Sequence, residues 1–171
     1  MSNVTNRQAK LIARPKPGLI TRDIFAFADA AIAEPAKNQF RVKIAYISLD
    51  PAMRGWINDG RSYVAPVELG HVMRAYAAGT VDASQHPDYK VGDAVQGLFG
   101  VQQYAISDGT RVVKVDTTLA PLERWVGGLG MPGWTAYFGL LEVGQPKAGE
   151  TVVVSAASGA VGSLVGQIAK I

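Results

Sequence analysis

A glycine-rich turn near the C-terminal end of the sequence has the residues and spacing of an anion-binding turn. Residues 155–162 read SAASGAVG, with Ala157, Gly159 and Gly162 in the places of a Gly-x-Gly-x-x-Gly pattern. Without a Cβ, Gly159 lets the backbone approach a pyrophosphate, and Gly162 lets a helix pack closely on a strand. A helix that begins here turns free N–H groups and a partial positive charge toward the anion. The pattern favours a nucleotide site over a purely structural turn.

The segments on either side of this turn are those that a nucleotide site requires. Residues 151–154 form an unbroken β-branched run, typical of a strand buried on both faces of a parallel sheet. The helix that follows has four apolar side chains on one face: Val161, Leu164, Val165 and Ile168. Strand, turn and helix are the first unit of a doubly wound fold. One such unit cannot bury its strand, so we expect the front part of a longer protein, with the residue that reads the ribose beyond Ile171.

The first two thirds of the sequence predict β-structure. From Phe40, apolar and charged residues alternate through Lys43, which is the period of a half-buried strand. A turn is expected at Gly92-Asp93. Other runs rich in β-branched and aromatic residues lie at 77–84, from Val95, at 100–107 and at 110–116. Short strands at this spacing predict a small closed or partly closed β-barrel.

Helices are predicted after residue 116. Thr118 as an N-cap, with Pro121 in the first turn, predicts a short helix. A second helix is expected to place four side chains on one face and to end in a left-handed cap at Gly144, before Pro146. The four side chains are Trp134, Tyr137, Leu140 and Leu141. We expect the domain boundary within 117–130 and assign residues 1–125 to the β domain and 126–171 to the start of the nucleotide-binding domain.

Composition narrows the possible classes of protein. The 171 residues carry 17 Lys and Arg against 14 Asp and Glu, a net charge of +3 without a dense basic block, which argues against a nucleic-acid partner. Cysteine is absent from the sequence, which excludes disulfides and thiolate-ligated metal sites. The N-terminal residues lack the apolar core of a signal peptide, and the apolar run 24–33 contains Asp29 and is too short to span a bilayer. We expect a soluble, cytoplasmic protein without a membrane partner.

Four stretches resemble the medium-chain dehydrogenases/reductases, and they occur in family order. They are YISLDPAMRGW (46–56), SYVAPVELGHVMRA (62–75), HPDYKVGDAV (86–95) and the run from GMPGWTAYFG to the glycine turn and helix (130–170). Within the family, the chain is similar to the zinc-independent branch of prostaglandin reductase (leukotriene hydroxydehydrogenase), alkenal double-bond reductase and curcumin-reductase-like proteins. The resemblance implies a mainly β, GroES-like, partly open barrel, followed by helices and the first βα unit of an incomplete Rossmann domain.

The resemblance also implies a reaction. It is the NADPH-dependent reduction of the C=C bond of α,β-unsaturated ketones and aldehydes, with hydride going to the β-carbon and a proton to the α-carbon of the enolate. The resemblance further implies a small-molecule enone or alkenal as partner, a homodimer, and a 171-residue chain that is inactive alone. Two alternatives stay open: a quinone oxidoreductase of the same superfamily, and a non-catalytic GroES-like binding module.

Site roles follow from the resemblance residue by residue. Tyr46 matches a tyrosine close to the substrate, whose phenol donates to the carbonyl oxygen and stabilises the enolate; a strand tyrosine half in the core is the alternative. Asp50, Met53 and Arg54 belong to the same signature, which implies that they shape the cofactor cleft beside the substrate pocket. An ion pair of Arg54 with Asp50 or Asp59 is as consistent with the sequence as a ligand contact.

Cofactor contacts are implied in two other stretches. Met131 is expected to pack at the nicotinamide end, and the Thr135 hydroxyl to reach the carboxamide; ordinary packing at a helix start is the alternative. The pyrophosphate turn is matched by Gly159, Ala160, Val161 and Gly162.

His71 and Tyr63 are the last two candidates. GHV at 70–72 resembles the Gly-His-Glu of zinc alcohol dehydrogenases, but Val72 replaces the glutamate, and His86 is the only other histidine in the sequence. A catalytic zinc needs three protein ligands, so we expect no metal and interpret His71 as a barrel or pocket histidine. Tyr63 is expected either to line the substrate cleft or to stand exposed in a loop.

Overall fold

The computed structural model describes residues 5–171, which divide into two compact units between Thr117 and Thr118. The first unit contains seven strands within its described residues, and the second contains helices. Among residues 5–171, no helix is both long and apolar enough to cross a bilayer.

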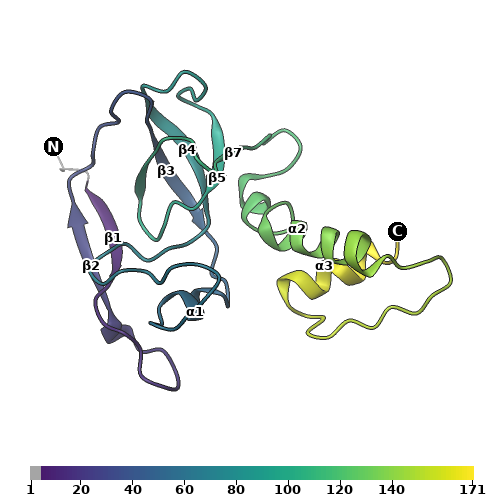
Figure 1. Cartoon of the computed structure of the whole chain (residues 1–171). Coiled ribbons are helices and arrows are strands. Elements are labelled where there is room, and N and C mark those ends of the chain that lie inside the picture. The colour runs from purple at the N-terminus through teal and green to yellow at the C-terminus, as the bar shows by residue number, and fades with distance from the viewer. Residues whose placement is uncertain (1–4) are drawn as a thin grey trace. The chain divides into compact units, whose positions relative to one another are not determined.

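Unit 1 consists of two antiparallel sheets (Figure 1). In the smaller sheet, β1 (Asn6–Leu11) pairs with β2 (Phe25–Ala30), two strands that the sequence patterns did not predict. The larger sheet has the order β6-β3-β4-β5-β7, and its end strands do not pair with each other, so the partly open barrel is confirmed. Its strands are β3 (Phe40–Ile47), β4 (Ala77–Ser84), β5 (Ala94–Gly97), β6 (Tyr104–Ser107) and β7 (Val113–Lys114).

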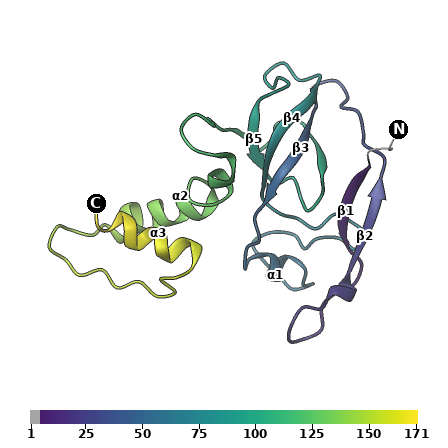
Figure 2. The same cartoon turned by 180° about the vertical axis from the view of Figure 1, so that it is seen from behind.

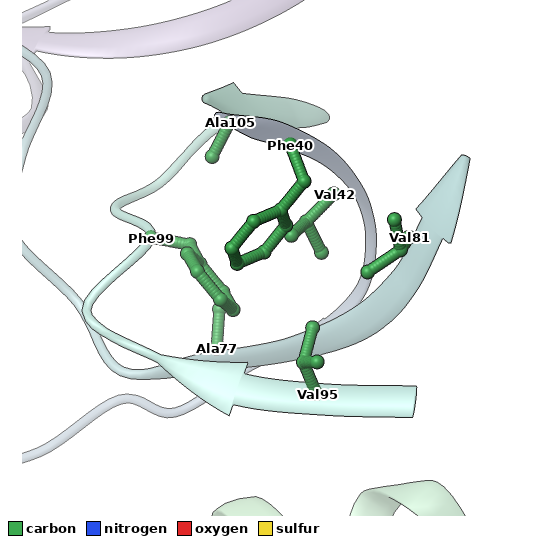
Figure 3. Packing of buried hydrophobic residues seen from close by; sticks show 7 residues of the cluster. All are labelled: Phe40, Val42, Ala77, Val81, Val95, Phe99 and Ala105. Atoms are coloured by element: carbon green, nitrogen blue, oxygen red, sulfur yellow. The ribbon is translucent and has the colours of Figure 1, made fainter. Parts of the chain in front are cut away.

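One core cluster lies against the larger sheet (Figure 3). Phe40 and Val42 from β3 point toward Val81 from β4 and Val95 from β5, and all four are at most 1% exposed. Alternate residues of β3 therefore face this core, as the charged and apolar alternation predicts. Ala77, Phe99 and Ala105 complete the cluster.

A second core cluster holds the segment that follows β3. In this cluster, Trp56 at the end of the short helix α1 (Met53–Trp56) and the next residue, Ile57, pack with Leu11 of β1. Ile24, Val67 and Met73 complete the cluster. The stretch 46–56 is thus fixed at its start by a strand and at its end by a buried tryptophan.

Unit 2 begins with a 3₁₀ helix, Leu122–Val126, whose N-cap is Pro121 and not the expected Thr118. The helix α2 (Met131–Phe138) continues as a π-helical stretch, Gly139–Gly144. Because this wider turn ends one residue later than expected, Gln145 and not Gly144 is left-handed, with φ of 47°, and its N–H donates to Leu140 O at 2.8 Å. The predicted helix and the stop before Pro146 are confirmed. Of the four side chains expected on one apolar face, only Leu140 is buried, and Trp134, Tyr137 and Leu141 are exposed.

The helix α3 (Ala160–Ile168) is confirmed and lies beside α2 in both views (Figures 1 and 2). The expected strand at 151–154 is not formed, and Val153 is 91% exposed. A parallel strand depends on hydrogen bonds from neighbouring strands, and the sheets of the described residues include no strand from unit 2. The prediction of a strand here was wrong for the chain as it stands.

Candidate functional site

Tyr46 is presented by an irregularity of β3. Ile44 lies opposite Gly79, and Tyr46 lies opposite Ala78, so Ala45 is the extra residue of a β-bulge. Strict alternation after Phe40 would turn Tyr46 toward the core, whereas the bulge leaves both Ala45 and Tyr46 exposed, Tyr46 by 43%. Bulges often re-aim a side chain beside an active site. The phenol of Tyr46 is therefore accessible to a ligand.

The opposite strand makes room for this bulge at Gly79. A Cβ on Gly79 would lie 2.8 Å from Val42 Cγ1 and 2.9 Å from Ile44 Cα, with the Lys43 carbonyl oxygen closer still. Real Cβ contacts are essentially never that short. The close approach of the two backbones thus depends on a residue without a side chain at position 79.

The segment after β3 turns sharply into α1. The Asp50 carbonyl accepts from the Met53 N–H at 3.0 Å, and the Ser48 hydroxyl donates to Asp50 Oδ1 at 3.1 Å. The Asp50 N–H also lies 3.4 Å from Met53 Sδ. These contacts make Asp50 and Met53 partners in one turn, so both have a structural role in addition to any contact with a ligand.

Arg54 does not form either of the expected ion pairs within the described residues. Its Nη1 donates to Asn58 Oδ1, four residues further along the chain. Asp59 pairs instead with Arg14, whose Nε lies 3.0 Å from Asp59 Oδ1. The i, i+4 spacing explains the choice, because it brings the Asn58 amide to the same side of the turn as Arg54.

The two histidines lie in different surroundings. His71 is at the surface and not inside the barrel: its side chain is 66% exposed, and Nδ1 lies 3.1 Å from Glu68 Oε2. His86 packs against Phe40 and Tyr89, with ring centroids at 5.8 and 5.0 Å. Over residues 5–171, no three His, Cys, Asp or Glu side chains gather where they could hold a metal ion.

Tyr63 lies in the loop 57–67 and is 79% exposed. Its oxygen accepts a hydrogen bond from Trp56 Nε1 at 3.0 Å. No sequence pattern predicts this pairing, because Trp56 and Tyr63 belong to different stretches and no periodicity links them.

In unit 2, the start of α2 carries Met131 and Thr135 one turn apart. The Thr135 hydroxyl donates to Met131 O at 2.8 Å and lies 3.6 Å from Met131 Sδ. Its proton is therefore used within the helix, while its oxygen lone pairs remain able to accept. An amide NH₂ group is the kind of donor that this oxygen could bind.

The glycine turn forms a tight bend before α3. Gly159 is the N-cap of the helix, and its N–H donates to Ala156 O at 2.9 Å. Ala156 has φ of 50°, a left-handed conformation that costs an L-residue about 1–2 kcal/mol. A Cβ on Gly162 would lie 2.9 Å from the Ala156 carbonyl carbon and nearer still to its oxygen. Backbone strain and close contact are typical of a site that binds a ligand.

This bend fits a phosphate group. The first helical bond is from the Ser163 N–H to Gly159 O at 2.9 Å, which leaves the N–H groups of Ala160, Val161 and Gly162 without intrahelical partners. Three such donors at the positive end of the helix dipole are the chemistry that a pyrophosphate requires.

The shifted pKa values of unit 1 belong to structural pairs and not to these candidates. Hydrogen bonds from Lys114 and from the Lys90 N–H lower the pKa of Asp93, and the Thr110 N–H lowers that of Asp108. The pKa of Arg41 is raised by its hydrogen bond to Asp82.

The antiparallel sheets of unit 1 and the glycine turn before α3 in unit 2 agree with the dehydrogenase/reductase class that the sequence resembles. The family described as the N-terminal domain of oxidoreductase matches residues 7–115, and the chain belongs to this family, in the branch of the curcumin, alkenal and prostaglandin reductases.

Two curated relatives and one crystal structure show how far the similarity extends. The "NADPH-dependent curcumin reductase" of Escherichia coli (strain K12) is 45% identical over 166 residues, 97% of this chain and 48% of that protein. The "2-alkenal reductase (NADP(+)-dependent)" of Nicotiana tabacum is 46% identical over 136 residues, 78% and 39% of the two chains. CurA from Vibrio vulnificus in complex with NADPH superposes with a TM-score of 0.88 at 44% identity, over 96% of this chain and 48% of that one. The chain spans about half the length of the curated relatives it matches.

Proposed function

We propose that the protein is an NADPH-dependent oxidoreductase that reduces the C=C bond of α,β-unsaturated ketones and aldehydes. The observation that carries this proposal is the bend at 155–162, where Gly162 lies too close to Ala156 for any side chain and three helix N–H groups are left for an anion. It is supported by relatives whose names include NADPH or NADP(+) and the reduction of curcumin or an alkenal.

The residues of unit 2 would hold the cofactor. The N–H groups of Ala160, Val161 and Gly162 would bind the pyrophosphate, with Gly159 as the N-cap that directs the chain into the helix. The Thr135 oxygen would accept from the carboxamide, and the Met131 side chain would pack against the adjacent ring. When bound, NADPH supplies the hydride for the β-carbon of the enone.

Tyr46 would act on the substrate in unit 1. Its exposed phenol would donate to the carbonyl oxygen, where negative charge develops as the enolate forms. A donor aimed at developing charge lowers the barrier more than it stabilises the bound substrate. Asp50 and Met53 would hold the turn beside it. Arg54, Tyr63 and His71 stay in the proposal as side chains near the substrate cleft.

Other parts of the proposal concern the protein as a whole. We assign residues 1–125 to a GroES-like domain and 126–171 to the start of an NADP-binding Rossmann domain. We propose that the reaction uses no zinc: NADPH would supply the hydride, the Tyr46 phenol would stabilise the enolate oxygen, and water would supply the proton for the α-carbon. A homodimer in the cytoplasm completes the proposal, and sedimentation of the intact protein measures its oligomeric state.

The experiment is an assay of NADPH oxidation by the intact protein, made with an enone, with a quinone and without an acceptor. The proposal predicts oxidation that depends on the enone. Oxidation with the quinone alone would favour a quinone oxidoreductase, and no acceptor-dependent oxidation would favour a binding module. The 171-residue chain assayed beside the intact protein is expected to be inactive.

A further inference from the structure

The loop 57–67, which carries Tyr63, is fixed at its base. The Val67 N–H donates to Trp56 O at 2.8 Å, which closes the loop at its two ends. Arg14, which follows β1 in the chain, donates through Nη1 to Ile57 O at 3.1 Å and to Val67 O at 2.7 Å. One guanidinium group therefore joins both ends of the loop. The Arg14 side chain that carries it is largely buried, with 25% of its surface exposed.

The middle of the loop is held as well. Arg74 donates through Nη1 to Ala65 O at 3.0 Å, and its guanidinium carbon lies 5.6 Å from the centre of the Trp56 ring. A cation at this distance from an indole face is attracted to the ring. Arg74 thus connects the loop to Trp56, in addition to the hydrogen bond between Trp56 and Tyr63.

Trp56 and Tyr63 form an unequal pair. Trp56 is 5% exposed and belongs to the second core cluster, so its position is set by packing. Tyr63 is 79% exposed, yet its oxygen is held 3.0 Å from the indole nitrogen. Within residues 5–171, the Tyr63 hydroxyl proton has no protein acceptor. The phenol therefore receives a hydrogen bond from the protein and keeps its own proton for another group.

We infer that Trp56 is a positioning residue that presents the Tyr63 hydroxyl as a hydrogen-bond donor to a carbonyl oxygen of the substrate; this inference rests on the proposed function. A hydrogen bond received by the phenol oxygen strengthens donation by its O–H, because the two bonds polarise each other. The indole N–H already uses the phenol oxygen as an acceptor, and the O–H is left to donate to an acceptor such as a carbonyl.

The fixed loop explains why such a donor is effective. A free surface tyrosine loses side-chain and loop entropy when it binds a ligand. Here Arg14, Arg74 and Trp56 have already ordered the loop, so the hydroxyl is in place before the substrate arrives. If the Trp56–Tyr63 hydrogen bond served only to satisfy the buried indole N–H, its role would be structural. The experiment separates this structural role from the positioning of a substrate donor.

The test is a double-mutant cycle in the intact protein with Trp56→Phe, Tyr63→Phe and the double variant. Tyr63→Phe is expected to lower kcat/KM for an enone roughly three- to tenfold, the loss of one hydrogen bond, with an unchanged Kd for NADPH. Trp56→Phe is expected to give a smaller loss. The double variant is expected to be no worse than Tyr63→Phe, because Trp56 acts through Tyr63. Tyr104→Phe is the matched control and leaves kcat/KM unchanged.

A second readout is independent of activity. In protein labelled with ¹⁵N at tryptophan, the Trp56 indole N–H signal is expected to shift in Tyr63→Phe and to stay in place in Tyr104→Phe. If Trp56→Phe does not fold, Arg74→Met replaces it in the cycle, because it removes the cation above the indole and the bond to Ala65.

The outcomes distinguish this inference from the proposed function. Additive losses, an unchanged kcat/KM in Tyr63→Phe, or an unmoved indole signal would overturn the inference while an active wild type leaves the reductase proposal intact. A wild type that does not reduce enones would overturn both.

Discussion

Replacing Gly162 by alanine tests the anion-binding bend with the smallest possible change. The new Cβ would lie 2.9 Å from the Ala156 carbonyl carbon and 3.0 Å from Ala157 Cα, where ordinary contact begins at 3.4 Å. Both neighbours are backbone, so the bend at 156–157 must move away by about half an ångström or more. Since α3 begins two residues earlier, at Ala160, the movement displaces the N–H groups that would bind phosphate.

The expected effect on binding is larger than the effect on stability. A hydrogen bond to a charged group contributes about 1.5–3 kcal/mol, so weakening one such bond raises the Kd for NADPH about tenfold to a hundredfold. Overpacking costs about 1–3 kcal/mol, but alanine is favoured over glycine in a helix by about 1 kcal/mol, so part of the stability loss is offset.

Gly166→Ala is the matched control. It is the same substitution in the same helix, four residues further on, and its Cβ would meet nothing within 4 Å. We expect it to raise the free energy of unfolding by about 0.5–1 kcal/mol and to leave the Kd unchanged. The measurement is fluorescence titration of the intact protein with NADPH, beside thermal unfolding of each variant. A Kd for Gly162→Ala equal to that of wild type and of Gly166→Ala would refute the anion-binding role of the bend.

Three further predictions concern unit 1. Tyr46→Phe is expected to lower kcat for an enone tenfold or more while the Kd for NADPH stays the same, since one donor to developing charge is lost; unchanged kinetics would return Tyr46 to a purely structural role. Gly79→Ala is expected to lower the free energy of unfolding by about 1–3 kcal/mol, measured by urea titration, because its Cβ meets the bulged strand; a variant as stable as wild type would contradict the close contact. The pKa of Asp93 is lowered in the folded state, chiefly by Lys114, so its contribution to stability is present above about pH 3.8 and is lost as the pH falls through the folded-state value. Asp93→Asn is therefore expected to show a smaller loss of Tm on acidification than wild type, and equal acid profiles would contradict this reasoning.

The β-strands were predictable because their signals are local. In β3 the alternation from Phe40 to Lys43 predicts which side chains face the core, and Figure 3 shows Phe40 and Val42 there. The same alternation gives the wrong direction for Tyr46, because a bulge interrupts it at Ala45. The bulge depends on Gly79 in another strand, and no periodic pattern records a contact between strands that are distant in sequence.

The helices show the same division between local and distant causes. The apolar face of α2 and the glycine turn before α3 are local patterns, and both helices are formed. The strand at 151–154 has an equally strong local pattern, yet it is not formed, because a strand also needs a hydrogen-bonding neighbour. The left-handed residue shifted from Gly144 to Gln145 because the sequence does not reveal the π-helical turn before it.

The two candidate sites, one in each unit, depend on the same physical feature, a backbone contact that leaves no space for a side chain. Gly79 lets β3 bulge and turn Tyr46 outward, and Gly162 lets the bend at Ala156 lie against the first turn of α3. In both places the absence of a side chain sets where a donor stands: the phenol of Tyr46 in one place, and the N–H groups at the start of α3, including that of Gly162 itself, in the other. Substitutions at these glycines are therefore expected to change binding or turnover through geometry alone. A higher NADPH concentration would restore the occupancy of the cofactor site and would therefore recover the rate of Gly162→Ala. It would not recover the rate of Tyr46→Phe, whose donor is lost.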